Sequence, residues 1–416
     1  MNAPIPYPFP APTSLYHPAA RFAEVRAEHP VARVVFPDSR TAWLVTGLDE
    51  ARQVLVDPRF SRAAAASSPD TPQFGLGPLA TESIIAMDPP GHTRLRRLVA
   101  SAFTARRVEE LRPRAARLVD ELIDAMQRQP RPVDLVENFS LPLPVQVICE
   151  LLGVPAADRH IFHAWSDTLM GDSQRDPAQT GAAFEGLSYY FAGLIAAKRA
   201  DPGDDLMTAL IAARDERDRL SERELVTMCL GLLIGGHETT ANQINMFVLT
   251  LMRYPDELTR LRAAAFPGRL DLWSAQDPTQ TPDAVPRAVE ELMRFSQLGD
   301  GGASLPRVTT EDVELGGVTI PKGAAVLPAL GPANRDPAVF TDPDRLDLTR
   351  RVNPHLGFGG GVHHCLGAQL ARMELQEALR GLLRRLPGLR VAVPDAELRF
   401  KPGMVVRSLE ALPVTW

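Results

Sequence analysis

The residue best suited to chemistry is Cys365, which follows a run of glycines. Residues 358–367 read FGGGVHHCLG and hold four glycines among ten residues. Glycine lets the backbone turn tightly and approach a flat, bulky ligand. A helix is expected from about Leu366, and the positive end of a helix dipole stabilises a thiolate. The segment therefore offers a soft anionic ligand, although a buried loop thiol alone would fit the same residues.

A second candidate segment is the sequence GGHETT at residues 235–240. It lies within the apolar-periodic stretch Ser221–Arg253, where each glycine costs about 1 kcal/mol relative to alanine in a helix. A helix weakened there would open room for a small molecule beside an acid, Glu238, and an alcohol, Thr239. The alternative is a kinked core helix whose threonine bonds to the preceding turn. A His-Glu-x-x-His zinc motif is excluded because Ala241 replaces the second histidine.

Two charged pairs at helical spacing complete the set of candidates. Glu291 and Arg294 lie three residues apart, which alone predicts a surface pair worth a few tenths of a kcal/mol. His92 and Arg96 lie four residues apart on one face of an expected helix. Two cationic groups on one face suit a dianionic partner, although a solvated helix face is the alternative.

The loop around Cys365 resembles the haem-binding signature of the cytochrome P450 family, Phe-Gly-x-Gly-x-His-x-Cys-x-Gly. Every fixed position is filled, at Phe358, Gly359, Gly361, His363, Cys365 and Gly367. The resemblance implies that Cys365 is the thiolate ligand of the iron of haem b and that His363 reaches a haem propionate. A thiolate ligand increases the electron density at the iron and favours cleavage of the O–O bond.

The other motifs occur in the family's order, and the resemblance extends from about Asp88 to the end. It implies an oxygen groove at residues 235–240, in which Thr239 and Glu238 support oxygen activation and Glu238 relays protons. It assigns His92, Arg96 and Arg307 to the propionates, and Glu291 with Arg294 to a structural pair completed by Arg345. The expected substrate pocket contains Leu232, Gly235, Gly236, Leu298 and Gly302. Gly235 departs from the alanine that is frequent in the family.

The positioning elements are expected to be mainly helices with small β-sheets, in the cytochrome P450 fold and in one domain spanning residues 1–416. The stretch Ser221–Arg253 predicts a helix that begins with a capping box and spans ~45 Å. Other helices are expected at Thr104–Met126, Gly181–Arg199 and Leu366–Leu386. Short strands are expected at Ala42–Thr46 and in a hairpin within Pro306–Val326.

Composition narrows the classes of partner. The net charge of -6 argues against a dominant nucleic-acid-binding role. Three scattered cysteines favour a reducing compartment, hence a cytoplasmic location, and Cys149 and Cys229 lie in apolar helical runs typical of core thiols. We find no signal peptide and no run of 18 apolar residues, which predicts no membrane segment. We also expect a monomer.

These observations predict a haem-thiolate monooxygenase. It would insert one atom of O2 into an apolar C–H or C=C bond of a bulky small molecule, in the secondary-metabolite tailoring of actinobacterial members. No fused flavin or iron–sulfur module is visible, so electrons are expected from a separate ferredoxin and an NAD(P)H-dependent ferredoxin reductase. The main alternative is a haem-based ligand or gas sensor, against which the pair Glu238 and Thr239 argues. A peroxide-driven enzyme would lack that pair, and a zinc hydrolase would need separated ligands.

Overall fold

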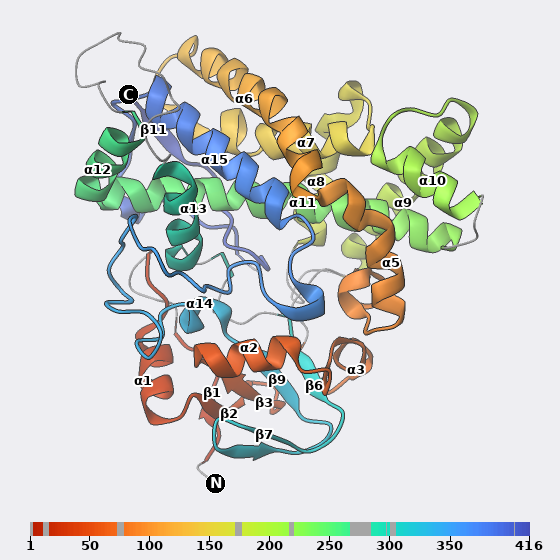
Figure 1. Ribbon diagram of the computed structural model, residues 1–416, viewed down its shortest axis with the longest axis vertical. Coiled ribbons are helices and arrows are strands. Elements are labelled where there is room, and N and C mark those ends of the chain that lie inside the picture. The colour runs from red at the N-terminus through yellow and green to blue at the C-terminus, as the bar shows by residue number, and fades with distance from the viewer. Residues whose placement is uncertain are drawn as a thin grey trace.

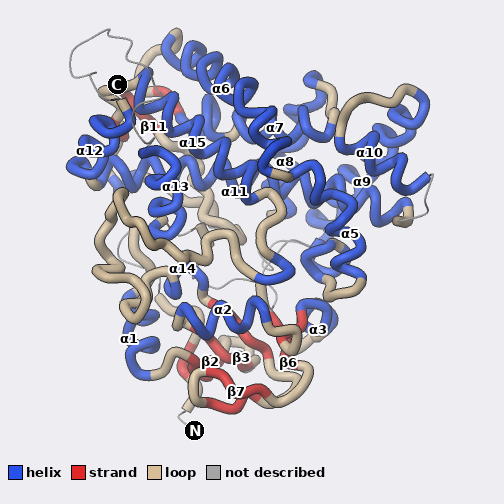
Figure 2. Tube along the Cα trace, in the orientation of Figure 1, coloured by secondary structure: helices blue, strands red, loops and turns tan. Residues whose placement is uncertain are grey.

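A computed structural model gives the fold as a large helical part with a sheet at the end that holds the N-terminus (Figures 1 and 2). The structure describes residues 3–10, 16–72, 79–170, 177–215, 220–266, 284–296, 298–299, 305–402 and 404–416. The α-helices are α1 Ala20–Glu28, α2 Leu48–Val56, α3 Arg62–Ser67, α4 Leu79–Glu82, α5 Gly91–Ala100, α6 Ala105–Gln127, α7 Pro142–Leu152, α8 Phe162–Leu169, α9 Pro177–Ala200, α10 Leu206–Asp215, α11 Glu222–Arg253, α12 Pro255–Ala265, α13 Ala284–Phe295, α14 Leu330–Ala333 and α15 Ala368–Arg385. The strands are β1 Ile5–Pro6, β2 Val31–Val35, β3 Thr41–Val45, β4 Phe60–Ser61, β5 Val133–Asp134, β6 Arg307–Thr309, β7 Val313–Leu315, β8 Val318–Ile320, β9 Ala325–Pro328, β10 Arg390–Val391 and β11 Pro413–Thr415.

Helix α11 is the central element of the helical part, which it crosses in Figure 1. The predicted capping box is confirmed: the Ser221 side chain accepts from the Glu224 N–H, and the Glu224 carboxylate accepts from the Ser221 N–H. Its neighbours are α7, α9 and α15, so most of its second half is buried. The helix ends at Arg253 because Pro255 begins α12.

The principal sheet has six strands in the order β1-β2-β3-β9-β6-β4. Strand β9 runs parallel to β3 and antiparallel to β6, so Val326 faces both Trp43 and Arg307 in register. This pairing fixes Arg307 at the start of β6, between the sheet and the helical part. Strands β7 and β8 form the predicted hairpin, whose turn uses Gly316 and Gly317 at positive φ.

Helix α15 packs closely on α6 and carries the expected apolar face, with Leu375, Leu379 and Leu382 buried. A Cβ atom at Gly381 would lie 2.1 Å from Val119 Cγ1, so glycine permits this close approach. The predicted helices and strands are thus present with ends shifted by a few residues. Among the described residues, no helix is long and apolar enough to span a bilayer.

Candidate active site

A cavity of about 450 Å³ separates the oxygen groove from the cysteine loop at residues 358–367. Its walls come from α5, α11, the cysteine loop, α15 and the C-terminal segment around Val405. Of the predicted pocket residues, Leu232, Gly235, Gly236 and Leu298 line this cavity, whereas Gly302 lies outside the described residues. The contributions of Val405 and Val406 were not predicted, because the C-terminal segment carries no motif.

The cysteine loop holds its shape through two glycines in the left-handed region. Gly359 has φ 67° and Gly361 has φ 63°, values that side chains rarely adopt. A Cβ atom at Gly361 would also lie 2.1 Å from the Leu55 carbonyl oxygen, so the loop packs against α2. The Cys365 N–H donates to the Phe358 carbonyl oxygen at 2.9 Å and closes the loop.

The Cys365 thiol lies deep in the protein but is accessible from the cavity. Burial raises the pKa of this thiol, while the Gly367 N–H and the guanidinium groups of Arg96 and Arg372 act in the opposite direction. The helix that was expected to stabilise the thiolate begins three residues later, at Ala368. The Arg372 guanidinium lies 4.3 Å from the centre of the Phe358 ring, which it holds beside the loop.

The oxygen groove faces the thiol from α11. Thr239 lines the cavity, and its hydroxyl donates to the Gly235 carbonyl oxygen at 2.8 Å. A Cβ atom at Gly235 would meet nothing within 4 Å, whereas one at Gly236 would lie 2.8 Å from Ile148 of α7. Gly235 therefore keeps space open, and Gly236 allows α7 to pack closely.

Glu238 lies apart from Thr239, although the two residues are adjacent in sequence. Its side chain is buried, lies 3.3 Å from His237 Nε2, and does not contribute to the walls of the cavity. A helix turns by about 100° per residue, so neighbours along the chain face different directions. The sequence placed both residues beside the groove, and the structure brings only Thr239 to the cavity.

A buried cationic cluster forms beyond the cysteine loop from Arg62, His92, Arg307 and His363. The rings of His92 and His363 lie 4.4 Å apart. Burial and the neighbouring cations lower the pKa of His363 to about 3 and that of Arg307 to about 9. Sequence reasoning missed Arg62, which lies in no motif and comes from the start of α3.

The cationic cluster fits the propionates of a haem. His92 Nδ1 and His363 Nε2 are buried without a hydrogen-bond partner, and an anionic oxygen would satisfy them. One carboxylate lies near, Asp88, but it accepts from the Ser61 hydroxyl at 2.5 Å and the Arg62 backbone N–H at 2.9 Å. With the accessible thiol of Cys365, these residues fit the iron and the acidic edge of haem.

Arg96, also assigned to the propionates, lines the cavity from α5. Its Nη2 donates to the carbonyl oxygen of His364 at 2.7 Å, so its guanidinium contacts the cysteine loop. That contact joins α5 to the loop and brings a positive charge near Cys365.

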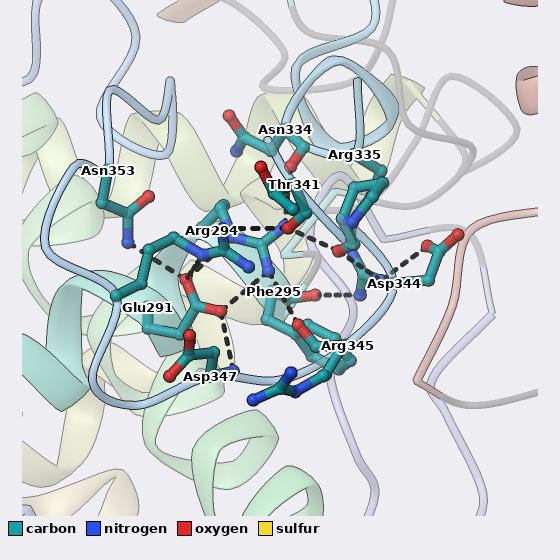
Figure 3. A network of polar contacts seen from close by, with 12 residues as sticks. Glu291, Arg294, Phe295, Asn334, Arg335, Thr341, Asp344, Arg345, Asp347 and Asn353 are labelled. Atoms are coloured by element: carbon teal, nitrogen blue, oxygen red, sulfur yellow. Dashed lines mark hydrogen bonds and ion pairs between the residues drawn. The ribbon is translucent and has the colours of Figure 1, made fainter. Parts of the chain in front are cut away.

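Glu291 and Arg294 form a fully buried pair, which their spacing alone did not predict (Figure 3). Arg294 donates to both carboxylate oxygens of Glu291 at 2.8 Å. The prediction that Arg345 completes the pair is wrong. Only its backbone carbonyl accepts from Arg294, at 3.3 Å, while the side chain that reaches Glu291 is that of Arg350, at 3.1 Å.

The same network contains an arginine that sequence reasoning missed, Arg335. Its Nη2 donates to the Phe295 carbonyl oxygen at 2.8 Å, and its guanidinium lies 3.7 Å from the centre of the Phe295 ring. It also pairs with Asp344 at 2.9 Å. The network therefore ties α13 to the segment that leads into the cysteine loop.

Comparisons with known proteins agree with this site. The family model described as Cytochrome P450 matches residues 193–397. The chain is 47% identical to nocardicin C N-oxygenase of Nocardia uniformis subsp. tsuyamanensis, over 99% of this chain and 98% of that protein. It is 46% identical to mycinamicin IV hydroxylase/epoxidase of Micromonospora griseorubida, over 96% and 95% of the two chains.

Solved structures give the same result for the fold. The LnmA cytochrome P450 hydroxylase from the leinamycin pathway of Streptomyces atroolivaceus superposes with a TM-score of 0.87 at 43% identity. That match covers 99% of this chain and 100% of the other. Identity at this level over nearly the whole length, together with the cysteine loop and its cavity, means that the chain belongs to the cytochrome P450 family.

Proposed function

We propose that this cytochrome P450 monooxygenase inserts one atom of O2 into a C–H or C=C bond of a bulky, mainly apolar small molecule. The other oxygen atom leaves as water, so each turnover consumes two electrons and two protons. The observation that carries the proposal is the Cys365 thiol, which faces the oxygen groove across a cavity with mostly apolar walls.

The residues of this chain would hold haem at both its iron and its acidic edge. Cys365 would ligate the iron, and His92, His363, Arg307 and Arg62 would bind the propionates. Bound haem supplies the redox chemistry of O–O bond cleavage, which a thiolate ligand favours. Arg96, which bonds to the His364 carbonyl, holds the cysteine loop in place and adds positive charge near the sulfur.

Thr239 would act in oxygen activation by hydrogen bonding in the cavity. Its hydroxyl proton is donated to Gly235, which leaves the oxygen lone pairs as acceptors for a water molecule beside the groove. Glu238 would supply protons from behind this face of α11, since it is buried beside His237. Substrate would contact Leu232, Gly235, Gly236 and Leu298.

The substrate class is supported by the relatives and by the cavity. The names of the relatives describe N-oxygenation of nocardicin C and hydroxylation or epoxidation of mycinamicin IV. We infer that this chain likewise tailors a secondary metabolite. Electrons would come from a separate ferredoxin and its NAD(P)H-dependent reductase, because the sequence shows no cysteine set for an iron–sulfur cluster.

The test is the difference spectrum of the reduced, carbon monoxide-bound protein. A haem-thiolate gives a strongly red-shifted Soret band, which we expect in the wild type and in the control variant Cys149→Ala. Cys365→Ser should abolish this band. If the band persists in Cys365→Ser, or the wild type binds haem without it, the assignment of Cys365 is wrong. A sensor would show the band but no product with O2, substrate and an electron supply.

A further inference from the structure

Two buried polar side chains at the far end of the cavity have no role in the proposed function. Glu374 of α15 and Gln243 of α11 both line the cavity, and both are at least nine-tenths buried. Neither carboxyl oxygen of Glu374 has a hydrogen-bond partner, and neither does the amide oxygen or nitrogen of Gln243. Each such buried group costs about 1–3 kcal/mol if it stays unsatisfied.

The helices place these groups on a line with the site. On α11, Gly236, Thr239 or Thr240, and Gln243 recur every three to four residues among the cavity walls, so Gln243 lies one turn beyond Thr239. On α15 and the residues before it, Gly367, Leu370 or Ala371, and Glu374 follow the same spacing. Because α11 and α15 pack against each other, the two stripes border one space.

Water is the chemistry that satisfies such a pair. A buried water needs two to four polar partners and occupies about 30 Å³, and the two side chains together present four polar atoms to the cavity. Burial is the sole cause that raises the pKa of Glu374 well above its usual value, so this carboxyl group holds its proton at neutral pH. A protonated carboxyl can donate to a water, whereas Gln243 can donate and accept.

We propose that Glu374 and Gln243 hold a buried water chain between α15 and α11, through which the Glu374 carboxyl delivers a proton to the oxygen groove at Thr239. The O–H bond of Glu374 breaks, its proton passes to the adjacent water, and that water releases one of its own protons toward Thr239. The Glu374 carboxylate regains a proton from water that enters through the cavity, so no further reactant is needed. Gln243 is the positioning residue for this chain.

This inference rests on the proposed function, because the proton is used in the reduction of O2. It adds a proton source that lines the cavity, which Glu238 does not. The two sources would act in parallel, so removal of either one leaves a working route. Parallel routes give a measurable signature: the loss in a double variant exceeds the product of the losses in the single variants.

The first experiment is infrared spectroscopy of the resting holoenzyme in H2O and D2O. We expect a carbonyl band of a protonated carboxylic acid that shifts in D2O, disappears in Glu374→Gln and persists in the control Glu377→Gln. Glu377 lies on the same helix, pairs with Arg112 and Arg380, and does not line the cavity. Gln243→Leu should move the frequency of the band, whereas Asn245→Leu should not. Asn245 is likewise a buried, unpartnered amide of α11, outside the cavity walls.

The second experiment measures product formed per electron consumed. Glu374→Gln and Gln243→Leu should each lower it by about tenfold, less than the roughly 10² expected for a sole general acid. Glu238→Gln with Glu374→Gln should lose more than the product of the two single losses. A band that fails to shift in D2O, or single losses that multiply, overturns the inference. The reduced carbon monoxide band separates the two failures, since its absence in the wild type contradicts the proposed function itself.

Discussion

Two buried clusters of positive charge lie on either side of the cysteine loop, and they differ in how that charge is compensated. Around Glu291, the carboxylate accepts from Arg294, Arg350, the Asn353 amide and the Asp347 N–H. Arg294 also donates to the carbonyl oxygens of Asn334 and Pro343. This cluster is complete within the protein itself.

The cationic cluster of Arg62, His92, Arg307 and His363 is incomplete. It leaves His92 Nδ1 and His363 Nε2 without partners, and burial lowers the pKa of both arginines. A folded protein bears such a cost where a bound group repays it. The comparison indicates that complete buried polar networks support the fold, and incomplete ones mark where a ligand binds.

The largest effect is expected from breaking the complete cluster. Arg294→Met leaves the Glu291 carboxylate buried with a weakened set of partners, which costs about 3–5 kcal/mol. We expect the midpoint of urea denaturation to fall sharply and little haem to be incorporated. Arg345→Met is the matched control, since only the backbone of Arg345 joins the network, and its midpoint should stay near that of the wild type. Equal losses in the two variants would restore a side-chain role for Arg345.

Removing a cation from the incomplete cluster should have the opposite effect on the empty fold. Arg307→Met relieves the repulsion with Arg62, so haem-free protein should keep or gain stability. Haem binding should weaken by about 1.5–3 kcal/mol, the value of a charge-assisted hydrogen bond, which a haem-transfer titration measures. If Arg307→Met destabilises the haem-free protein and leaves haem affinity unchanged, the cluster is structural and the comparison fails.

The same cluster predicts a pH dependence of the haem-free protein. The pKa of His363 is lowered from 6.5 to about 3 in the fold. Below about pH 6.5 the unfolded chain therefore binds a proton that the folded chain does not. Stability is fully present above pH 6.5 and falls toward pH 3, by up to about 1.4 kcal/mol per pH unit. His363→Phe should flatten this slope in urea denaturation measured from pH 7 to pH 4.5, and an unchanged slope would place the titration elsewhere.

Sequence reasoning found the elements and the residues that local patterns mark. The capping box of α11, the hairpin β7–β8 and the glycines of the cysteine loop follow from rules of spacing and backbone geometry. It could not separate Arg345 from Arg350, because both lie in one irregular segment and only tertiary packing decides which guanidinium turns inward. Arg62, Glu374 and Gln243 were missed for a related reason: each lies in an ordinary helical pattern, and only the fold leaves its polar atoms facing a ligand space.

The smallest change in stability is expected at Thr239, where the comparison can be tested inside the cavity. The Thr239 hydroxyl donates only to Gly235 within its own helix, so Thr239→Ala removes no contact between elements. Stability should stay within about 0.5 kcal/mol, as for substitutions away from packed features. The same change should divert about tenfold more of the reducing equivalents to hydrogen peroxide, because the hydroxyl holds the water that delivers the proton, within the 10²–10⁴ range of acid–base effects or just below it. The control is Thr250→Ala, whose hydroxyl bonds to Ser296 far from the cavity walls. It should show the reverse pattern, a loss of stability with normal coupling. If Thr239→Ala lost stability while its coupling stayed intact, the oxygen groove would belong with the complete network and not with the ligand site.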